Sequence, residues 1–243
     1  MKKKNIGIEL NRWIANNTKF SRRKATQLIK DRKVSVNNVT TDKPYHKISL
    51  NDVVKISGKT IKSNPDTEKN IYYMLNKPKG YVSSTRSDSS GSPPVTTLVR
   101  EESRIYPVGR LDIDSKGLII LTNDGDLTYK LTHPKSKVEK EYLVFVKGKV
   151  TNQKIDILQQ GIDLKEGKTK PVKIEINKIN NQGAWITIII SEGKYRQIRR
   201  MFASVDLHVI ELTRVRIGSL RLNKPNPGEY KILSNKEVQL LIK

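Results

Sequence analysis

The segment GRLDIDSKGLIILTNDG, from Gly109 to Gly125, limits the possible folds more than any other part of the chain. Its apolar run LIIL lies between two stretches rich in turn-forming residues, which is the pattern of a short buried strand. Strand-like segments begin at Ile71 and continue toward the C-terminus, with helical stretches between them. They are IYYMLNKP, GRLDID, GLIILT, EYLVFVKG and AWITIII. The sequence therefore predicts a strand-rich domain in this part of the chain.

The charge of the chain indicates its class of partner. The 47 basic and 24 acidic residues give a formal net charge of +23, and an excess of this size attracts polyanions, above all nucleic acid. A membrane surface is the alternative, but no segment is an amphipathic helix with enough apolar bulk to anchor there. No run approaches the roughly 18 apolar residues of a membrane span. We therefore expect a cytoplasmic protein.

Composition also divides the chain. Residues 1–60 are strongly basic, and residues 61–70, IKSNPDTEKN, are polar, contain a proline and have no hydrophobic period. We expect a small domain at 1–60, a linker at 61–70 and a larger domain at 71–243. The chain has no cysteine, which excludes disulfides and thiolate metal sites.

A helix expected after Ser21 carries its charges at an unusual place. Ser21 is a good N-cap, and Ala25, Leu28 and Ile29 form an apolar face. The cations of the first turn oppose the helix dipole but suit a phosphate site beside the free N–H groups. These cations are Arg22, Arg23 and Lys24. A solvated basic helix start is the alternative interpretation.

The segment DRKVSVNN that follows predicts a short strand with Val34 and Val36 inward and a turn at Asn37–Asn38. Residues 8–56, with SRRKATQLIKDRKVSVNN at the centre, resemble an S4 domain. That resemblance implies a small α+β module that binds structured RNA. Arg32 and Lys33 join the three helix cations as candidate RNA contacts.

Asp112 is a carboxylate just ahead of the buried LIIL strand, in a strand or at its edge. The residues that follow it, Asp114 to Gly117, predict a turn, and turn chemistry also accounts for Asp124 and Asp126. It does not account for Asp112. An ion pair with Arg110, two residues away on one strand face, is the structural alternative.

Residues 192–205, EGKYRQIRRMFASV, predict an anchored helix that presents arginines. Helical spacing places three arginines on one face and four apolar residues on the other. The arginines are Arg196, Arg199 and Arg200, and the apolar residues are Ile198, Met201, Phe202 and Val205. The arginine face is either solvated or contacts phosphates, with one arginine turned toward a carboxylate, where it would favour the ionised form.

Tyr142 begins an alternating, half-buried strand, where a tyrosine is usually part of the core and, in an RNA enzyme, can stack on an extruded base. Motifs for other chemistry are missing. His46, His133 and His208 are scattered, and there is no Walker loop, HExxH, GxSxG or GxGxxG pattern. We expect no metal and no cofactor.

Several segments together resemble one enzyme family. GRLDIDSKGLIILTNDGDL, VEKEYLV and EGKYRQIRRMF are similar, in order and rough spacing, to the motifs of the RsuA-type pseudouridine synthases, a group that includes the RluB, RluE and RluF enzymes. The flanking YYMLNKPKGYVSS and LTRVRIGSLRLNKPNPGEY extend the resemblance over nearly the whole chain. It implies an α+β (mixed) fold, with a small S4 domain ahead of a catalytic domain built on a long, mainly antiparallel sheet with flanking helices.

The resemblance also implies an isomerase reaction. A uridine in RNA loses its N1–C1′ bond, the uracil turns, and C5 bonds to C1′, so no cofactor is needed. Asp112 matches the catalytic aspartate, acting as nucleophile or as base toward the sugar. Tyr142 matches a tyrosine expected to stack on the uracil. Arg199 matches an arginine expected to pair with Asp112.

The remaining matches concern substrate contact and the target RNA. Ile198 matches an apolar contact beside the base, and Arg110 a residue that helps hold the gap left by the flipped nucleotide. The arginine face of the helix adds Arg196 and Arg200 as candidate substrate contacts. We expect a monomer that acts on ribosomal RNA or a ribosomal assembly intermediate, in the large rather than the small subunit. The alternatives are a non-catalytic S4-type RNA-binding or ribosome-assembly factor and a different RNA-modifying enzyme such as a methyltransferase.

Overall fold

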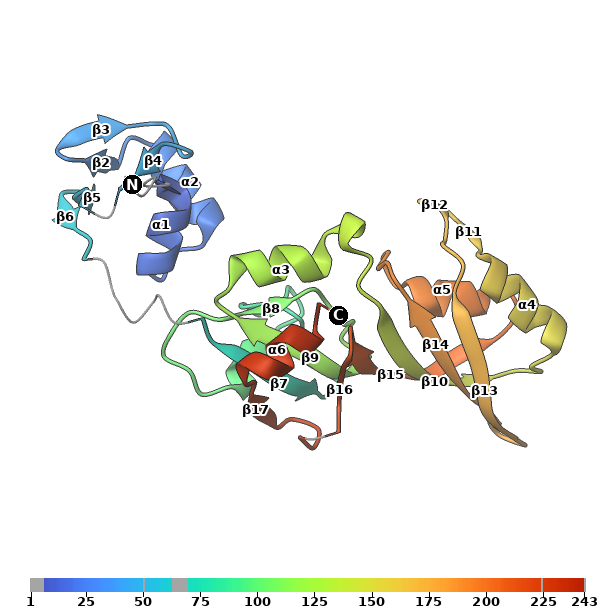
Figure 1. Cartoon of the computed structure of the whole chain (residues 1–243). Coiled ribbons are helices and arrows are strands. Elements are labelled where there is room, and N and C mark those ends of the chain that lie inside the picture. Colours follow the sequence, from blue (N-terminus) through green and yellow to red (C-terminus); the bar gives the residue numbers. More distant parts are fainter. Residues whose placement is uncertain (1–6, 50, 63–69, 224, 243) are drawn as a thin grey trace. The chain divides into compact units, whose positions relative to one another are not determined.

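The chain forms two compact units, Met1–Asn70 and Ile71–Lys243, in a computed structural model (Figure 1). The structure describes residues 7–49, 51–62, 70–223 and 225–242. Most of the linker expected at 61–70 lies outside these residues. None of the helices within the described ranges is long and apolar enough to span a membrane.

The N-terminal unit packs two helices against short strands. A four-stranded antiparallel sheet has the order β3-β2-β5-β6, and a separate two-stranded sheet joins β1 to β4. The elements are β1 (Ile8–Glu9), α1 (Leu10–Asn17), α2 (Arg22–Lys30), β2 (Val34–Val36), β3 (Val39–Thr41), β4 (Lys47–Ile48), β5 (Val54–Ile56) and β6 (Lys59–Thr60). Their apolar side chains share one core, to which both helices and the strands β2, β4 and β5 contribute.

Local sequence signals in this unit are confirmed. Ser21 caps α2, because its hydroxyl accepts a hydrogen bond of 3.1 Å from the Lys24 backbone N–H. Val34 and Val36 of β2 are both buried. The turn to β3 places Asn37 and Asn38 at φ of 50° and 66°, the conformation that asparagine tolerates best after glycine.

The second unit is built on one nine-stranded sheet. Its strand order is β13-β14-β10-β15-β9-β7-β17, with β16 paired to β15 and β8 paired to β9. The strands are β7 (Tyr72–Lys77), β8 (Tyr106–Val108), β9 (Lys116–Thr122), β10 (Lys140–Lys147), β13 (Lys173–Asn180), β14 (Gly183–Ile190), β15 (His208–Ile217), β16 (Leu220–Arg221) and β17 (Tyr230–Ile232). All pairs are antiparallel except β9 with β15, so the expected mainly antiparallel sheet is confirmed.

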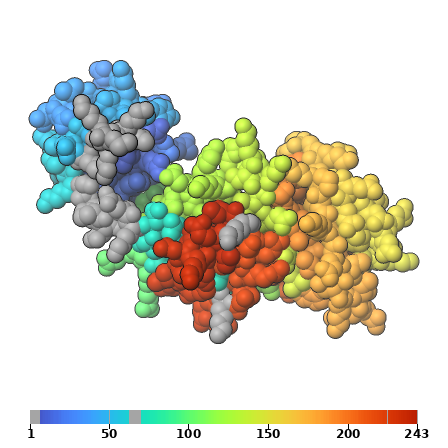
Figure 2. Space-filling model, viewed as in Figure 1, coloured from blue at the N-terminus to red at the C-terminus, as the bar shows by residue number. Residues whose placement is uncertain are grey.

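Helices cover both faces of this sheet. They are α3 (Gly125–Thr132), α4 (Asn152–Gln160), α5 (Gln197–Ala203) and α6 (Asn235–Leu240). Two short 3₁₀ helices, η2 (Val95–Leu98) and η3 (Pro134–Ser136), and a small hairpin of β11 (Asp163–Leu164) and β12 (Gly167–Lys168) complete the unit. The C-terminal segment, in red, lies between the green and orange parts of the unit on the face shown in Figure 2.

β9 contributes to two cores because its LIIL run alternates between the two faces. Ile119 and Leu121 pack in the core that includes α4 and α5. Leu118 and Ile120 pack in the core that includes α3 and α6. All four side chains are completely buried, which explains why the run has no polar residue.

The sequence-based boundaries around this strand need two corrections. GRLDID does not form a strand, because only Tyr106–Val108 pairs with β9 and the residues after it form a loop. The NDG segment is the start of a helix rather than a free turn. Asp124 caps α3 by accepting hydrogen bonds from the N–H groups of Asp126 and Leu127.

A row of paired residues crosses five adjacent strands and places the functional side chains. Lys77 pairs with Gly117, Gly117 with Arg214, Arg214 with Tyr142, and Tyr142 with Ile188. Paired residues share a face and neighbouring strands lie about 4.8 Å apart. Gly117 has a φ of +108°, and a Cβ there would lie 2.3 Å from the Arg214 carbonyl oxygen. Only glycine therefore allows this parallel contact.

Candidate active site

Asp112 lies in the loop between β8 and β9, immediately before a turn at residues 113–114. A buried lysine fixes this loop. The Lys77 Nζ donates to the backbone oxygens of Asp112 at 3.1 Å, Ser115 at 2.8 Å and Pro78 at 3.0 Å. The Ser115 N–H also donates to the Asp112 carbonyl at 3.0 Å. The backbone of Asp112 is therefore held from both ends of the turn.

The Lys77 side chain is completely buried. Burial lowers the pKa of Lys77 to about 8, although the carboxylates of Asp112 and Asp114 oppose this shift. An ammonium group has three N–H donors, and here each one has a carbonyl acceptor. The lysine thus fixes the position of the loop and places a positive charge beneath it.

Two arginines contact the carboxylates of the loop. Arg196 Nη1 lies 3.7 Å from Oδ2 of Asp112, and the same guanidinium donates two hydrogen bonds, of 3.2 and 3.1 Å, to Asp114. Arg199 Nη2 lies 3.1 Å from Oδ2 of Asp114. The expected pairing of Arg199 with Asp112 is therefore wrong: Arg196 takes that place, and Arg199 pairs with Asp114.

The backbone conformation of Arg196 explains why this arginine, and not Arg199, contacts Asp112. Helix α5 begins at Gln197, and Arg196 is its N-cap residue in the left-handed conformation, with φ 46°. Helical spacing therefore does not describe the direction of its side chain. Arg199, inside the helix, donates to the carbonyl oxygens of Val209 at 2.9 Å and Asp114 at 3.2 Å. It joins α5, the start of β15 and the Asp112 loop.

The two aspartates differ in their environments. Burial raises the pKa of Asp114, but the hydrogen bonds from Arg196 and the charge of Arg199 outweigh it, so this pKa lies below its ordinary value. The guanidinium groups of Arg196 and Arg199 therefore bind mainly to Asp114. The Asp112 side chain retains 29% exposure, and among the described residues its carboxylate forms an ion pair with Arg196. Its carboxylate can meet a substrate.

The other residues of the arginine helix lie elsewhere. Arg200 donates to the two carboxylate oxygens of Glu166 at 3.1 and 2.8 Å, on the β11–β12 hairpin, so the structure does not bring it to Asp112. Ile198 is 4% exposed and belongs to the core beneath α4 and α5. Arg110 is exposed, and no ion pair joins it to Asp112 within the described ranges. The proposed structural alternative for Asp112 is therefore not observed.

Tyr142 lies in the cross-strand row and is 7% exposed. The guanidinium carbon of Arg214 is 6.0 Å from the centroid of the tyrosine ring, and Arg214 Nη1 is 3.5 Å from the phenol oxygen. Arg214 Nε donates to the Leu118 carbonyl at 2.7 Å. The arginine thus connects the tyrosine to the strand that follows the Asp112 loop.

Sequence reasoning missed three residues of this arrangement, namely Lys77, Asp114 and Arg214. A signal for two of them exists in the strand alternation. Lys77 shares the inward parity of Tyr73 and Leu75, and Arg214 that of Leu212. A charged residue at an inward position of an apolar strand indicates a buried, partnered group. Asp114 gave no such signal, because a turn already accounted for it.

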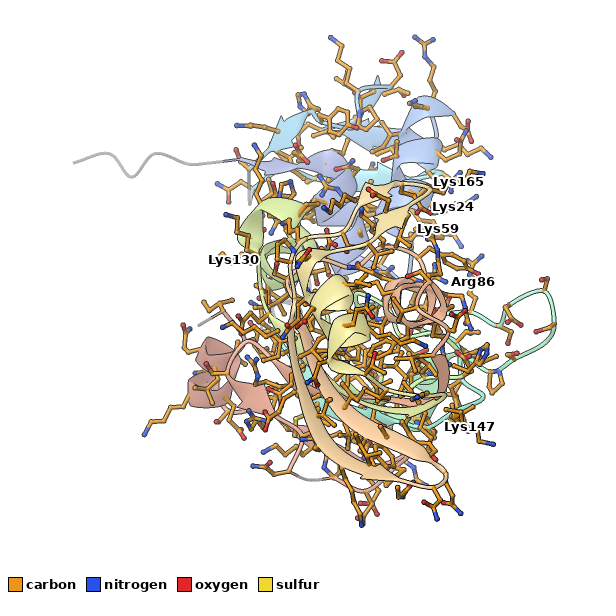
Figure 3. The ribbon with its side chains drawn as sticks, turned by 90° about the vertical axis from the view of Figure 1, so that its right-hand side faces the viewer. Lys24, Lys59, Arg86, Lys130, Lys147 and Lys165 are labelled. Carbon is orange, nitrogen blue, oxygen red and sulfur yellow. The ribbon has the colours of Figure 1, made fainter. Side chains whose placement is uncertain are left out.

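The N-terminal unit carries the other predicted cations on its surface. Arg22, Arg23, Lys24, Arg32 and Lys33 are all exposed, and Lys24 is labelled in Figure 3. Two of the five are neutralised, since Arg22 pairs with Glu9 and Arg32 with Asp42 at 3.3 Å. No carboxylate of the described residues pairs with the other three, which are therefore available for phosphates.

Comparisons with known proteins agree with this geometry. Residues 71–204 match the RNA pseudouridylate synthase family, and residues 10–54 match the S4 domain. The chain is 37% identical to the ribosomal large subunit pseudouridine synthase B of Bacillus subtilis, over 96% of this chain and 94% of that protein. It is 33% identical to the ribosomal small subunit pseudouridine synthase A of Escherichia coli, over 97% of this chain and 100% of that protein.

A solved structure extends the likeness to three dimensions. The crystal structure of a pseudouridylate synthase superposes with a TM-score of 0.68 at 30% identity, covering 96% of this chain and 99% of that one. The expected S4 domain and catalytic fold are confirmed. The chain belongs to the RsuA/RluB family of RNA pseudouridine synthases, which are isomerases.

Proposed function

We propose that this isomerase converts one uridine of large-subunit ribosomal RNA to pseudouridine, with Asp112 as the group that acts on the ribose. The observation that carries the proposal is the state of the Asp112 carboxylate. It is partly exposed beside the Arg196 guanidinium, on a loop fixed by the buried ammonium of Lys77. A carboxylate held in this way can meet an extruded nucleotide without first being reoriented.

The reaction needs only one such group. Asp112 acts on the sugar as nucleophile at C1′ or as base, the N1–C1′ bond breaks, the uracil turns, and C5 bonds to C1′. The proton of C5 is exchanged for one on N1, so the isomer has the composition of the substrate. Positive charge from Arg196 and Lys77 stabilises the carboxylate whenever it leaves the sugar.

Other residues act on the base and on the loop. Tyr142 contacts the uracil, and Ile198 supports the apolar side of the base pocket. Arg199 acts through Asp114, since it binds the loop rather than Asp112. Arg110, exposed two residues before Asp112, fills the gap left in the RNA. Extrusion of the uridine costs a few kcal/mol, which contacts between the basic surface and the phosphates offset.

The choice of the large subunit rests on two supports. Identity is 37% to the large-subunit relative and 33% to the small-subunit relative. The segments RIYPVGRLD and LTHPKSKVEKEYLV also resemble the large-subunit members of the family.

A map of pseudouridine in ribosomal RNA, from cells with and without the gene, tests the proposal. We expect one large-subunit site to disappear and to return with the wild-type chain but not with Asp112→Asn. Loss of a small-subunit site instead would correct the target and keep the chemistry. If every site persists in both subunits, the ribosomal assignment is wrong and transfer RNA is the next target to map; if its sites persist as well, a non-catalytic S4-type factor becomes the better description.

Substitution of Arg22, Arg23 and Lys24 together by Ala should weaken RNA binding and flatten its salt dependence. Because Arg22 is already paired with Glu9, we expect the slope of log K against log salt to fall by about 2 rather than 3. Titration of ribosomal RNA fragments at several salt concentrations measures it. Glu9→Gln is the matched control: it frees Arg22 and should steepen the slope by about 1. Unchanged slopes in both variants would show that α2 does not contact the RNA.

A further inference from the structure

A group of cations beside Tyr142 has no role in the chemistry described above. Lys140 precedes Tyr142 by two residues on β10 and therefore lies on the same face of the sheet. Arg214 lies opposite Tyr142 on β15. The third member, Lys170, follows β12, and its backbone N–H donates to Glu192, two residues after Ile190, the partner of Lys140 on β14. We name Lys140, Lys170 and Arg214 the cation cluster.

The charge of this cluster is uncompensated. No ion pair to a carboxylate joins any of the three residues in the part of the chain that the structure describes, and the Lys140 Nζ donates only to the Val138 carbonyl, at 3.0 Å. Burial and the two neighbouring cations lower the pKa of Lys140 to about 8. A protein gains nothing from holding like charges together in a partly buried place unless an anion joins them.

Arg214 gives independent support. It is 3% exposed, and its Nη2 is buried without a hydrogen-bond partner. A buried guanidinium N–H without an acceptor costs free energy, so the protein holds this positive charge beneath the two lysines at a cost. The Glu192 carboxylate does not supply the missing acceptor, since it accepts hydrogen bonds from the Lys170 backbone N–H at 3.0 Å and from Gln197 at 2.7 Å.

We propose that the cation cluster binds one phosphodiester of the RNA backbone next to the extruded uridine. Lys140, which is half-buried, and Lys170, which is exposed, contact the phosphate oxygens. Arg214 adds positive charge from beneath. An anion held there is fixed relative to Tyr142 and the base it contacts, so the cluster positions the nucleotide rather than reacting with it. This inference rests on the proposed function.

The test removes the negative charge of one RNA phosphate and the positive charge of one lysine, first separately and then together. The substrate is a short RNA hairpin that carries the mapped uridine, with a neutral methylphosphonate linkage placed at single positions around it. We expect one linkage to lower kcat/KM of the wild-type enzyme by about 30-fold. Lys140→Gln should lose about as much on natural RNA, yet lose no more than about 2-fold further at that linkage, because the two changes remove the same contact.

Two further variants keep the result interpretable. Lys147→Gln is the matched control, since Lys147 is the exposed lysine at the other end of β10 (Figure 3); it should keep wild-type activity and full sensitivity to the linkage. Lys170→Gln, on the surface, cannot disturb the core. It should reproduce the loss of sensitivity in weaker form even if Lys140→Gln fails to fold.

Additive losses for both Lys140→Gln and Lys170→Gln at every linkage would overturn the inference. So would a wild-type enzyme that tolerates all the neutral linkages. Either result leaves the proposed function intact provided that the wild type modifies natural RNA and Asp112→Asn does not. Turnover by Asp112→Asn would instead contradict the proposed function itself.

Discussion

Asp112→Asn lowers the rate of pseudouridine formation under single-turnover conditions by at least about 10⁴-fold, because an amide replaces the carboxylate that we propose acts on the sugar. RNA affinity changes by less than about 3-fold, since the amide keeps the size of the carboxylate. The free energy of unfolding changes by less than about 1 kcal/mol, because the partly exposed carboxylate has a long ion pair, of 3.7 Å, with Arg196. Release of tritium from C5-labelled RNA measures the rate.

Two other aspartate substitutions serve as comparisons for this result. Asp156→Asn makes the same change at an exposed position of α4 and should leave the rate unaltered. Asp114→Asn weakens the hydrogen bonds from Arg196 and should slow the reaction while leaving measurable turnover. If Asp114→Asn were inactive and Asp112→Asn active, the assignment of the two aspartates would be reversed.

Lys77→Met lowers the free energy of unfolding by about 3 kcal/mol at pH 7, because the Pro78 and Ser115 carbonyls lose their Lys77 donor, and each buried unsatisfied group costs about 1–3 kcal/mol. The Asp112 carbonyl keeps the hydrogen bond from the Ser115 N–H. Relief from burying the ammonium offsets part of the loss. Denaturant unfolding followed by circular dichroism measures it. The control Lys149→Met changes an exposed lysine and should remain within about 0.5 kcal/mol of the wild type.

The same pair of variants has a pH signature. The pKa of Lys77 is about 8 in the folded protein, against an ordinary value of 10.5. Between these two values the unfolded chain binds more protons than the folded chain, so the stability of the wild type relative to Lys77→Met rises as the pH increases from about 8 to 10.5. Lys149→Met is measured over the same pH range as the reference. A flat difference for Lys77→Met would mean that the lysine titrates normally.

Short-range features of this protein could be predicted because they depend on neighbouring residues. The Ser21 cap, the Asn37–Asn38 turn and the buried LIIL strand each follow from a few adjacent side chains and backbone preferences. The family motifs also predict Asp112 as the catalytic carboxylate, and that assignment stays a prediction. The boundary at GRLDID failed, since strand pairing there ends at Val108 and the glycine and polar residues that follow form a loop.

Contacts within the site could not be predicted from spacing. The arginine pattern at 196, 199 and 200 assumed one continuous helix, whereas Arg196 adopts a left-handed conformation before α5 begins. That single residue redirects one guanidinium to Asp112 and leaves Arg199 on Asp114. Arg200 turns to Glu166 on a distant hairpin. Each outcome depends on which segments pack beside the helix, which no local pattern encodes.

The sequence by itself determined the polyanion partner and the local caps and turns, and it predicts Asp112 as the acidic group, because charge and short-range preferences are carried by the residues themselves. Only the tertiary structure decided what surrounds that group. Lys77, Gly117, Arg214 and Tyr142 are separated by up to 137 positions, yet strand pairing places them in one row. The physical reason is that hydrogen bonding across strands sets positions at intervals of about 4.8 Å irrespective of distance along the chain.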